Sequence, residues 1–251
     1  MHRRQTLKAL AGLVLCPLCA RTGSAAEGPH WGFEGHEGPG HWSDLDPAFR
    51  ACGVGSQQSP IDVIGSVPAQ LPQLDFAWAK RADTIVNNGH TIQVNFNSGG
   101  ALSAGPARYT LVQVHFHRPS EHLVDGKSFP MEAHFVHQNA AGGLGVIGVL
   151  MAAGNSNAVF KKVVTTMPTS AGAPIPAEEG IDPNALLPAR RSYYRYEGSL
   201  TTPPCSETVD WMLLTDPIEV ADAEIAAFAK LYAMNARPVQ KLNRRFVLRS
   251  G

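Results

Sequence analysis

The sequence predicts a single, mainly β domain. Several segments alternate apolar and polar residues as strands do, one segment has a helical pattern, and no linker or internal repeat divides the chain. A length of 251 residues allows one large domain or two small ones, and the lack of a linker favours one. Basic and acidic residues are equal in number, 21 of each, which excludes a nucleic-acid-binding protein because that function needs surplus Lys and Arg.

The first 26 residues have the composition of a secretory signal peptide. Basic residues precede an apolar run at 9–20, which is too short to span a bilayer of about 30 Å, and small residues end at a cleavage site after Ala26. The pair Arg3-Arg4 begins a motif that resembles a twin-arginine signal, with an ordinary Sec signal as the alternative. We therefore expect a mature domain of residues 27–251, periplasmic or secreted, with no membrane span.

Cleavage changes both the charge and the cysteine content. The signal carries four basic and no acidic residues, so the mature chain has 17 bases against 21 acids, a formal charge of −4. Only Cys52 and Cys205 remain, and two cysteines in an exported protein suggest one disulfide, with two free buried thiols as the alternative. A disulfide closing so long a loop stabilises the fold by at most about 5 kcal/mol.

The periodicity places five strands and one helix along the mature chain. Residues 27–60 are irregular, and residues 165–190, rich in Pro, Ala and Gly, are predicted to be loop. A helix is predicted over 221–234, where Ile225, Phe228 and Tyr232 share one face. The strands are predicted at 91–96, 109–117, 131–137, 144–151 and 208–214.

Five of the ten histidines lie between positions 115 and 137. His115 and His117 are two residues apart on a strand and point to one side, and His134 on the next strand is able to lie opposite them. Three such imidazoles can form a metal site with one position left for water. The alternative interpretation is that they are unrelated histidines on the surface. Gln113 and Glu132 each precede a histidine by two residues, share its face, and are suited to orient its ring.

A cupin is a rival interpretation of the same residues. His115-x-His117-x₃-Glu121 resembles the first metal motif of these jelly-roll proteins, in which the Glu is itself a ligand and iron or manganese is common. Their second motif usually has a Pro-x-Gly before the last histidine. Here the residues before His134 are Pro130-Met131-Glu132-Ala133, without Gly, which weakens the cupin interpretation.

Six segments in order resemble the α-class carbonic anhydrases of the exported bacterial type. They are Gln57-Gln58-Ser59-Pro60-Ile61-Asp62, Asn87-Asn88-Gly89-His90, Gln113 to His117, Ser120-Glu121-His122, Glu132 to His137 and Ser199-Leu200-Thr201-Thr202-Pro203-Pro204. The resemblance implies a large twisted, mostly antiparallel central sheet with short peripheral helices. It implies a zinc lyase that hydrates carbon dioxide reversibly to bicarbonate and a proton, in which zinc hydroxide attacks CO₂. Exported bacterial members are often dimers, which leaves a homodimer open.

The resemblance also assigns roles to residues. Zinc is expected on His115, His117 and His134, Thr201 is expected to orient the hydroxide and pass its own proton to Glu121, and His90 is expected to shuttle protons. The substrate-binding residues are expected to be Thr202, Val136, Val146, Leu200, Val209 and Trp211. A Cys52–Cys205 disulfide is expected to tether the loop that carries Thr201.

Some residues depart from the family pattern. Phe33 replaces a common Tyr and Gln93 a common Asn, and both changes bear on proton transfer. Arg118 stands where Trp is frequent. A catalytically silent relative that acts as a binding module is a further alternative, and the presence of all three histidines, Glu121 and Thr201 counts against it.

Overall fold

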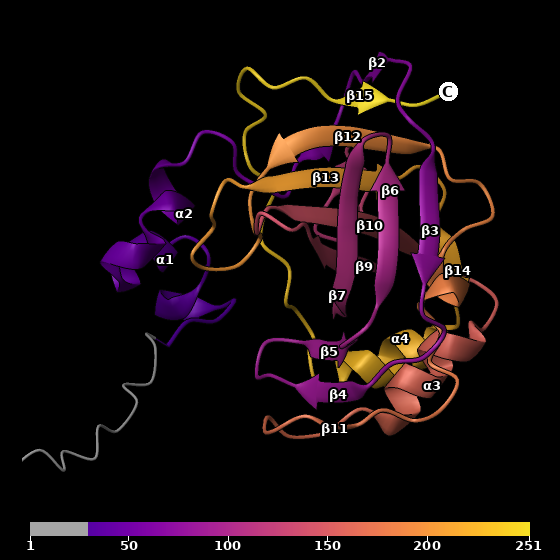
Figure 1. Ribbon diagram of the computed structural model, residues 1–251. Helices are drawn as coiled ribbons and strands as arrows, with labels where there is room; N and C mark the ends of the chain where they lie inside the picture. The colour runs from indigo at the N-terminus through magenta and orange to yellow at the C-terminus, as the bar shows by residue number, and fades with distance from the viewer. Residues whose placement is uncertain (1–29) are drawn as a thin grey trace, which may run out of the picture.

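The computed structural model describes residues 30–251, so the predicted signal peptide lies outside the described residues. Strands are the main regular secondary structure of these residues, as Figure 1 shows. They are β1 (Asp62–Val63), β2 (Val67–Pro68), β3 (Leu74–Trp78), β4 (Thr84–Asn87), β5 (Ile92–Asn95), β6 (Gly100–Ala104), β7 (Ala107–His117), β8 (Leu123–Val124), β9 (Met131–Gln138), β10 (Leu144–Ala153), β11 (Ile175–Pro176), β12 (Tyr193–Gly198), β13 (Val209–Leu214), β14 (Ile218–Val220) and β15 (Leu248–Arg249).

A 13-stranded sheet contains all of these strands except β1 and β8, which pair with each other. Its order is β11-β4-β5-β7-β9-β10-β13-β12-β15-β2, while β3 and β6 extend from β7, and β14 pairs with β10. Most neighbours are antiparallel, and the parallel pairs are β10–β13, β10–β14 and β15–β2. The prediction of one mainly β domain with a large, mostly antiparallel sheet is therefore confirmed.

The helices are short and lie around the sheet. They are α1 (Trp42–Leu45), α2 (Ala51–Val54), α3 (Ala158–Thr166) and α4 (Asp222–Ala229), with single turns of 3₁₀ helix at Gly35–Glu37, Pro47–Phe49 and Pro183–Leu186. Figure 1 shows α1 and α2 at one side of the sheet, and α3 beside α4 at its lower end. Within residues 30–251 no helix combines the length and the apolar composition needed to cross a membrane.

The five predicted strands are all present, as β5, β7, β9, β10 and β13. The predicted helix over 221–234 is too long, because α4 ends at Ala229 and the backbone N–H groups of Leu231 and Tyr232 both turn back to the Phe228 carbonyl. The irregular 27–60 segment includes α1 and α2, and the predicted loop at 165–190 contains β11 and one 3₁₀ turn.

The sequence pattern missed α3. Its residues Ala158–Thr166 are rich in Val and Thr, which favour strands, so intrinsic propensity points away from a helix. Asn157 nevertheless caps its first turn by accepting the N–H groups of Val159 and Phe160. The helix buries Phe160 and Val163 against the sheet, so packing overrides propensity.

The two faces of the central strands differ in composition. On the face covered by α3 and α4, Phe116 of β7 packs against Phe160 and Phe228 within the main apolar core. The opposite face carries a smaller apolar cluster, which includes Val146 and Trp211. The polar residues described below lie beside this smaller cluster.

The N-terminal segment is attached to the sheet by a disulfide. Cys52 of α2 and Cys205, in the loop between β12 and β13, are bonded, with their Cα atoms 5.0 Å apart. Both cysteines are buried in an aromatic cluster with Trp42 and Phe49. The disulfide joins the two segments that the resemblance predicts it to join.

Candidate active site

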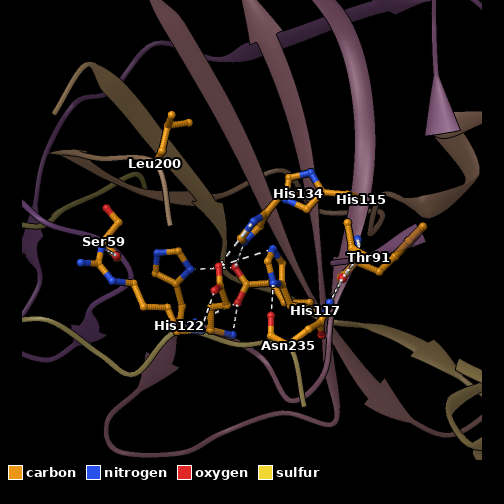
Figure 2. A network of polar contacts seen from close by, with 12 residues as sticks. Ser59, Thr91, His115, His117, His122, His134, Leu200 and Asn235 are labelled. Carbon is orange, nitrogen blue, oxygen red and sulfur yellow. Dashed lines mark hydrogen bonds and ion pairs between the residues drawn. The ribbon is translucent and has the colours of Figure 1, made fainter. Parts of the chain in front are cut away.

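Three histidines meet on one face of two neighbouring strands. His115 and His117 lie two residues apart on β7 and point to the same side. His134 on β9 lies directly opposite His115 in the antiparallel register. One ring nitrogen from each lies within 4.8 Å of the other two, and Figure 2 shows the rings turned toward one another. The structure thus brings the three predicted ligands into one cluster.

Each of these histidines has one ring nitrogen bonded to an oxygen outside the cluster. The pairs are His115 Nδ1 with Gln113 Oε1, His117 Nδ1 with Asn235 O, and His134 Nε2 with Glu132 Oε1, each at 2.8 Å. Because these oxygens accept, the three bonded nitrogens carry the protons and the remaining three have free lone pairs. His117 Nε2 is buried and makes no hydrogen bond within residues 30–251. The donor set therefore fits a metal ion.

Burial keeps the three imidazoles neutral. It lowers the pKa of His117 to about 4, holds the pKa of His115 well below its usual range, and lowers the pKa of His134. The positive charge that His117 and His134 could carry lowers the pKa of His115 further. Neutral imidazole is the form that binds metals, so the cluster is ready for an ion at neutral pH.

Glu121 lies beside the cluster and is fully buried. Its Oε2 is 3.5 Å from His117 Nε2 and 3.8 Å from His134 Nδ1, and its Oε1 accepts the backbone N–H of Arg237 at 2.8 Å. Burial raises the pKa of the Glu121 carboxyl to about 7, against the effects of His134, the Arg237 N–H and the Thr201 hydroxyl. Thr201 is also buried. Its hydroxyl is close enough to lower the pKa of Glu121, but Glu121 Oε2 accepts no hydrogen bond from any described residue. A bound cation would favour the ionised carboxylate.

A second group of potential ligands, His122, Glu132 and His134, is a closed hydrogen-bond network. His122 Nδ1 lies 2.7 Å from Glu132 Oε1 and His122 Nε2 lies 2.6 Å from the Tyr196 hydroxyl, so neither ring nitrogen is free for a metal. Burial alone would raise the pKa of Glu132, but His122 and His134 hold it well below its usual range. A carboxylate bonded to His134 in this way fixes the orientation of the ring and raises the basicity of its other nitrogen.

The apolar residues predicted to hold the substrate form one wall. Val146 of β10 lies opposite Val136 of β9 on one side and Trp211 of β13 on the other. Val209 and Leu200 pack in the same cluster. The ring centroid of Trp211 is 4.8 Å from that of His134, so this wall borders the histidine cluster.

His90 lies across a small cavity from the cluster, in the turn between β4 and β5. The Asn88 side chain holds this turn by accepting the N–H groups of His90 and Thr91. The imidazole of His90 stacks on Trp31, with centroids 3.6 Å apart and planes 6° apart. Burial, and then His30, lowers the pKa of His90.

The cavity has a volume of about 120 Å³. Its lining includes His90, His115, His117 and Thr202, and also the two departures from the family pattern, Phe33 and Gln93. A larger groove of about 940 Å³ lies elsewhere, lined by Arg195, Asp210, Phe246 and others, and contains none of the histidines. We assign the site to the smaller cavity, because two of the three clustered histidines, His115 and His117, line it and no histidine lines the larger groove.

Sequence patterns missed two residues of this site. Asn235 supplies the acceptor for His117, and the backbone of Arg237 supplies a donor to Glu121. Both act through backbone atoms in an irregular segment after α4, more than a hundred residues from their partners. Backbone contacts over such separations leave no periodic signal in a sequence.

A buried three-histidine cluster with one open side, set on an antiparallel sheet beside an apolar wall, defines a class of metal-dependent enzymes. The model of the eukaryotic-type carbonic anhydrase family matches residues 37–251. Carbonic anhydrases of Pectobacterium carotovorum and Neisseria gonorrhoeae are each 40% identical to the chain, covering 90% and 97% of it and 93% and 98% of their own lengths.

Solved structures agree with these relatives. The α-carbonic anhydrase of Thermovibrio ammonificans, solved with the inhibitor sulfanilamide, has a TM-score of 0.86 and 44% identity, covering 88% of this chain and all of its own. The chain belongs to the eukaryotic-type, or α-class, carbonic anhydrase family. It is accordingly an enzyme of carbon dioxide hydration, and the predicted family resemblance is confirmed.

Proposed function

We propose that the chain hydrates carbon dioxide reversibly with zinc held by His115, His117 and His134. One observation carries this proposal: in each histidine one ring nitrogen is committed to an oxygen acceptor and the other has a free lone pair, and one nitrogen of each ring lies within 4.8 Å of the other two. Zinc held by these residues would lower the pKa of a bound water to about 7, a value known from carbonic anhydrases themselves, and would so supply a nucleophile at neutral pH.

Glu121 and Thr201 are proposed to orient the nucleophile. Glu121 is fixed by the Arg237 N–H and lies beside two of the ligands, so its carboxylate is a fixed acceptor. In the proposed active form the Thr201 hydroxyl donates a hydrogen bond to that carboxylate, so the hydroxyl oxygen is left only to accept. A hydroxyl that can only accept favours a nucleophile that donates a hydrogen bond to it. That bond would orient the nucleophile so that its lone pair points at CO₂.

The apolar wall is proposed to hold carbon dioxide next to the cluster. CO₂ has no net charge and no dipole, so the buried surface of Val146, Val209 and Trp211 suits it better than a polar surface does. Val136 and Leu200, which are half-buried, extend this wall, and Thr202 lines the cavity beside His115 and His117. All three are proposed to contact the substrate. Gln113 and Glu132 are proposed to orient the rings of His115 and His134.

His90 is proposed to carry the product proton to solvent. Imidazole titrates near neutral pH, and His90 shares the cavity with two of the ligands. Its lowered pKa favours release of the proton to buffer at neutral pH.

We further propose that residues 1–26 are a signal peptide and that residues 27–251 act as the mature enzyme in the periplasm or outside the cell. The Cys52–Cys205 disulfide supports an oxidising compartment. Mass spectrometry of protein from the exported fraction tests the proposal, which requires an N-terminus at Glu27. The homodimer stays a prediction, to be tested by sedimentation.

A stopped-flow hydration assay combined with metal analysis tests the main proposal. We expect one zinc per chain and rapid CO₂ hydration in the wild type, with both retained in the exposed-residue control His36→Ala. Metal-free, inactive protein would favour the binding module, and bound iron without hydration would favour a cupin-type oxidoreductase. Either result would contradict the proposal.

A further inference from the structure

The side chain of Asn235 joins two segments of the site, the turn that carries His90 and the end of β7. It is fully buried, and its amide nitrogen donates to the carbonyl oxygens of His90 and Phe116, both at 3.0 Å. Its amide oxygen accepts the backbone N–H of Arg118 at 2.7 Å. Both donors and the acceptor of this amide are therefore used, and the resulting geometry is fixed.

Thr91 forms a second connection between the same two segments. Its hydroxyl donates to the Phe116 carbonyl at 2.6 Å and accepts the Phe116 N–H at 3.3 Å. Phe116 is the residue between the ligands His115 and His117. Figure 2 shows Thr91 and Asn235 close to the strand that carries these two histidines. Two buried side chains thus dock the turn that carries His90 onto the segment that carries the ligands.

The His90 side chain has little else to hold it. Within residues 30–251 its imidazole makes no hydrogen bond, and its principal contact is the stack on Trp31. The position of the ring relative to the cluster therefore depends on where the backbone of the turn lies. Proton transfer through water depends steeply on that separation, since a shift of about 1 Å can cost roughly 100-fold in rate.

We propose that Asn235 and Thr91 are positioning residues for proton transfer, because they set the distance between His90 and the metal-binding strand. This inference rests on the proposed function, in which His90 carries the proton. It assigns to the Asn235 side chain a role separate from that of its backbone carbonyl, which accepts from His117. The side chain can be changed while that carbonyl remains.

The variant Asn235→Asp removes the donors without changing the shape. It places a carboxylate oxygen against the carbonyls of His90 and Phe116, which repels both, and it keeps an acceptor for Arg118. Thr91→Val removes the hydroxyl at similar volume, and Thr91→Ser restores it. Val163→Ala is the matched control, because it weakens the buried core on the other face without touching the site.

The test is stopped-flow hydration at increasing buffer concentration, with zinc content measured for each variant. We expect Asn235→Asp to lower kcat in weak buffer about 10-fold while kcat/KM stays within about 2-fold. Added imidazole should restore kcat. Thr91→Val should also lower kcat in weak buffer without lowering kcat/KM, but by a smaller factor. Thr91→Ser and Val163→Ala should match the wild type. Crystal structures of Asn235→Asp and Thr91→Val, with or without metal, should show the His90 ring displaced from Trp31.

Three results would overturn the inference: unchanged kcat in weak buffer, an equal loss of kcat and kcat/KM, or an unmoved His90 ring. If Asn235→Asp does not fold, Thr91→Val decides the question alone. His90→Ala separates this inference from its premise. If kcat of His90→Ala in weak buffer equals that of the wild type, the proposed role of His90 is wrong. If kcat falls in His90→Ala but not in Asn235→Asp or Thr91→Val, only the positioning roles are wrong.

Discussion

Strand β9 carries two histidines that lie in different environments on opposite faces of the sheet. His134 and His137 are three residues apart, so they face opposite sides of the sheet. His134 bonds Glu132 through one nitrogen and turns the other toward the cluster, whereas His137 bonds the Gly145 carbonyl and packs against Trp78 in the main core. Both are fully buried and both have lowered pKa values. Residue type and burial therefore do not define a ligand; the face of the strand and the neighbouring lone pairs do.

The largest expected effect on this comparison comes from His134→Ala. Removing one of three ligands should abolish tight zinc binding and lower kcat/KM by at least about 1,000-fold. Metal analysis and the hydration assay measure both effects. Normal zinc content with normal turnover would show that the site lies elsewhere.

On the other face, Phe135→Ala should destabilise the fold and leave the chemistry intact. Phe135 is fully buried and stacks on Trp78, so its truncation should lower the free energy of unfolding by about 3–5 kcal/mol. Denaturant titration gives this value, and kcat/KM per folded, zinc-loaded molecule should be unchanged. A large fall in kcat/KM would break the separation between the two faces.

His137 should make the free energy of unfolding depend on pH. Burial lowers its pKa to about 4 from an ordinary value of 6.5, so between these values the unfolded chain binds more protons. Its contribution is complete above about pH 6.5 and is lost as the pH falls toward 4, by about 3 kcal/mol in total. Unfolding titrations of the metal-free protein should show a flatter dependence in His137→Asn. An identical slope in both proteins would rule His137 out as the acid-sensitive group.

The smallest expected effect comes from the partner of His134. Glu132→Gln keeps the shape of the side chain but removes the charge that fixes and strengthens the ligand. Zinc affinity should fall by about 10- to 100-fold, measured by competition with a chelator. Gln113→Ala, which removes a neutral acceptor, should lower zinc affinity by a smaller factor. The reverse order would mean that the Glu132 charge adds nothing to binding.

The contrast between the two histidines also shows how far the sequence can predict. Period-2 alternation places His115 and His117 on the same face of their strand, and His134 and His137 on opposite faces of theirs, because strand geometry is local. The register that sets His134 opposite His115 is not local, and neither is the acceptor that Asn235 provides for His117. The helix α3 was missed for a related reason: Phe160 and Val163 gain enough from packing on the sheet to overcome a β-favouring composition.

Anomalous diffraction at the zinc absorption edge, from crystals of the purified protein, tests the central claim most directly. The account predicts one zinc peak bonded to His115 Nε2, His117 Nε2 and His134 Nδ1, each at about 2.0–2.1 Å, with a fourth position open to water. A peak bonded to His122, to His137 or to the Glu121 carboxylate, or no peak at the cluster, would contradict it.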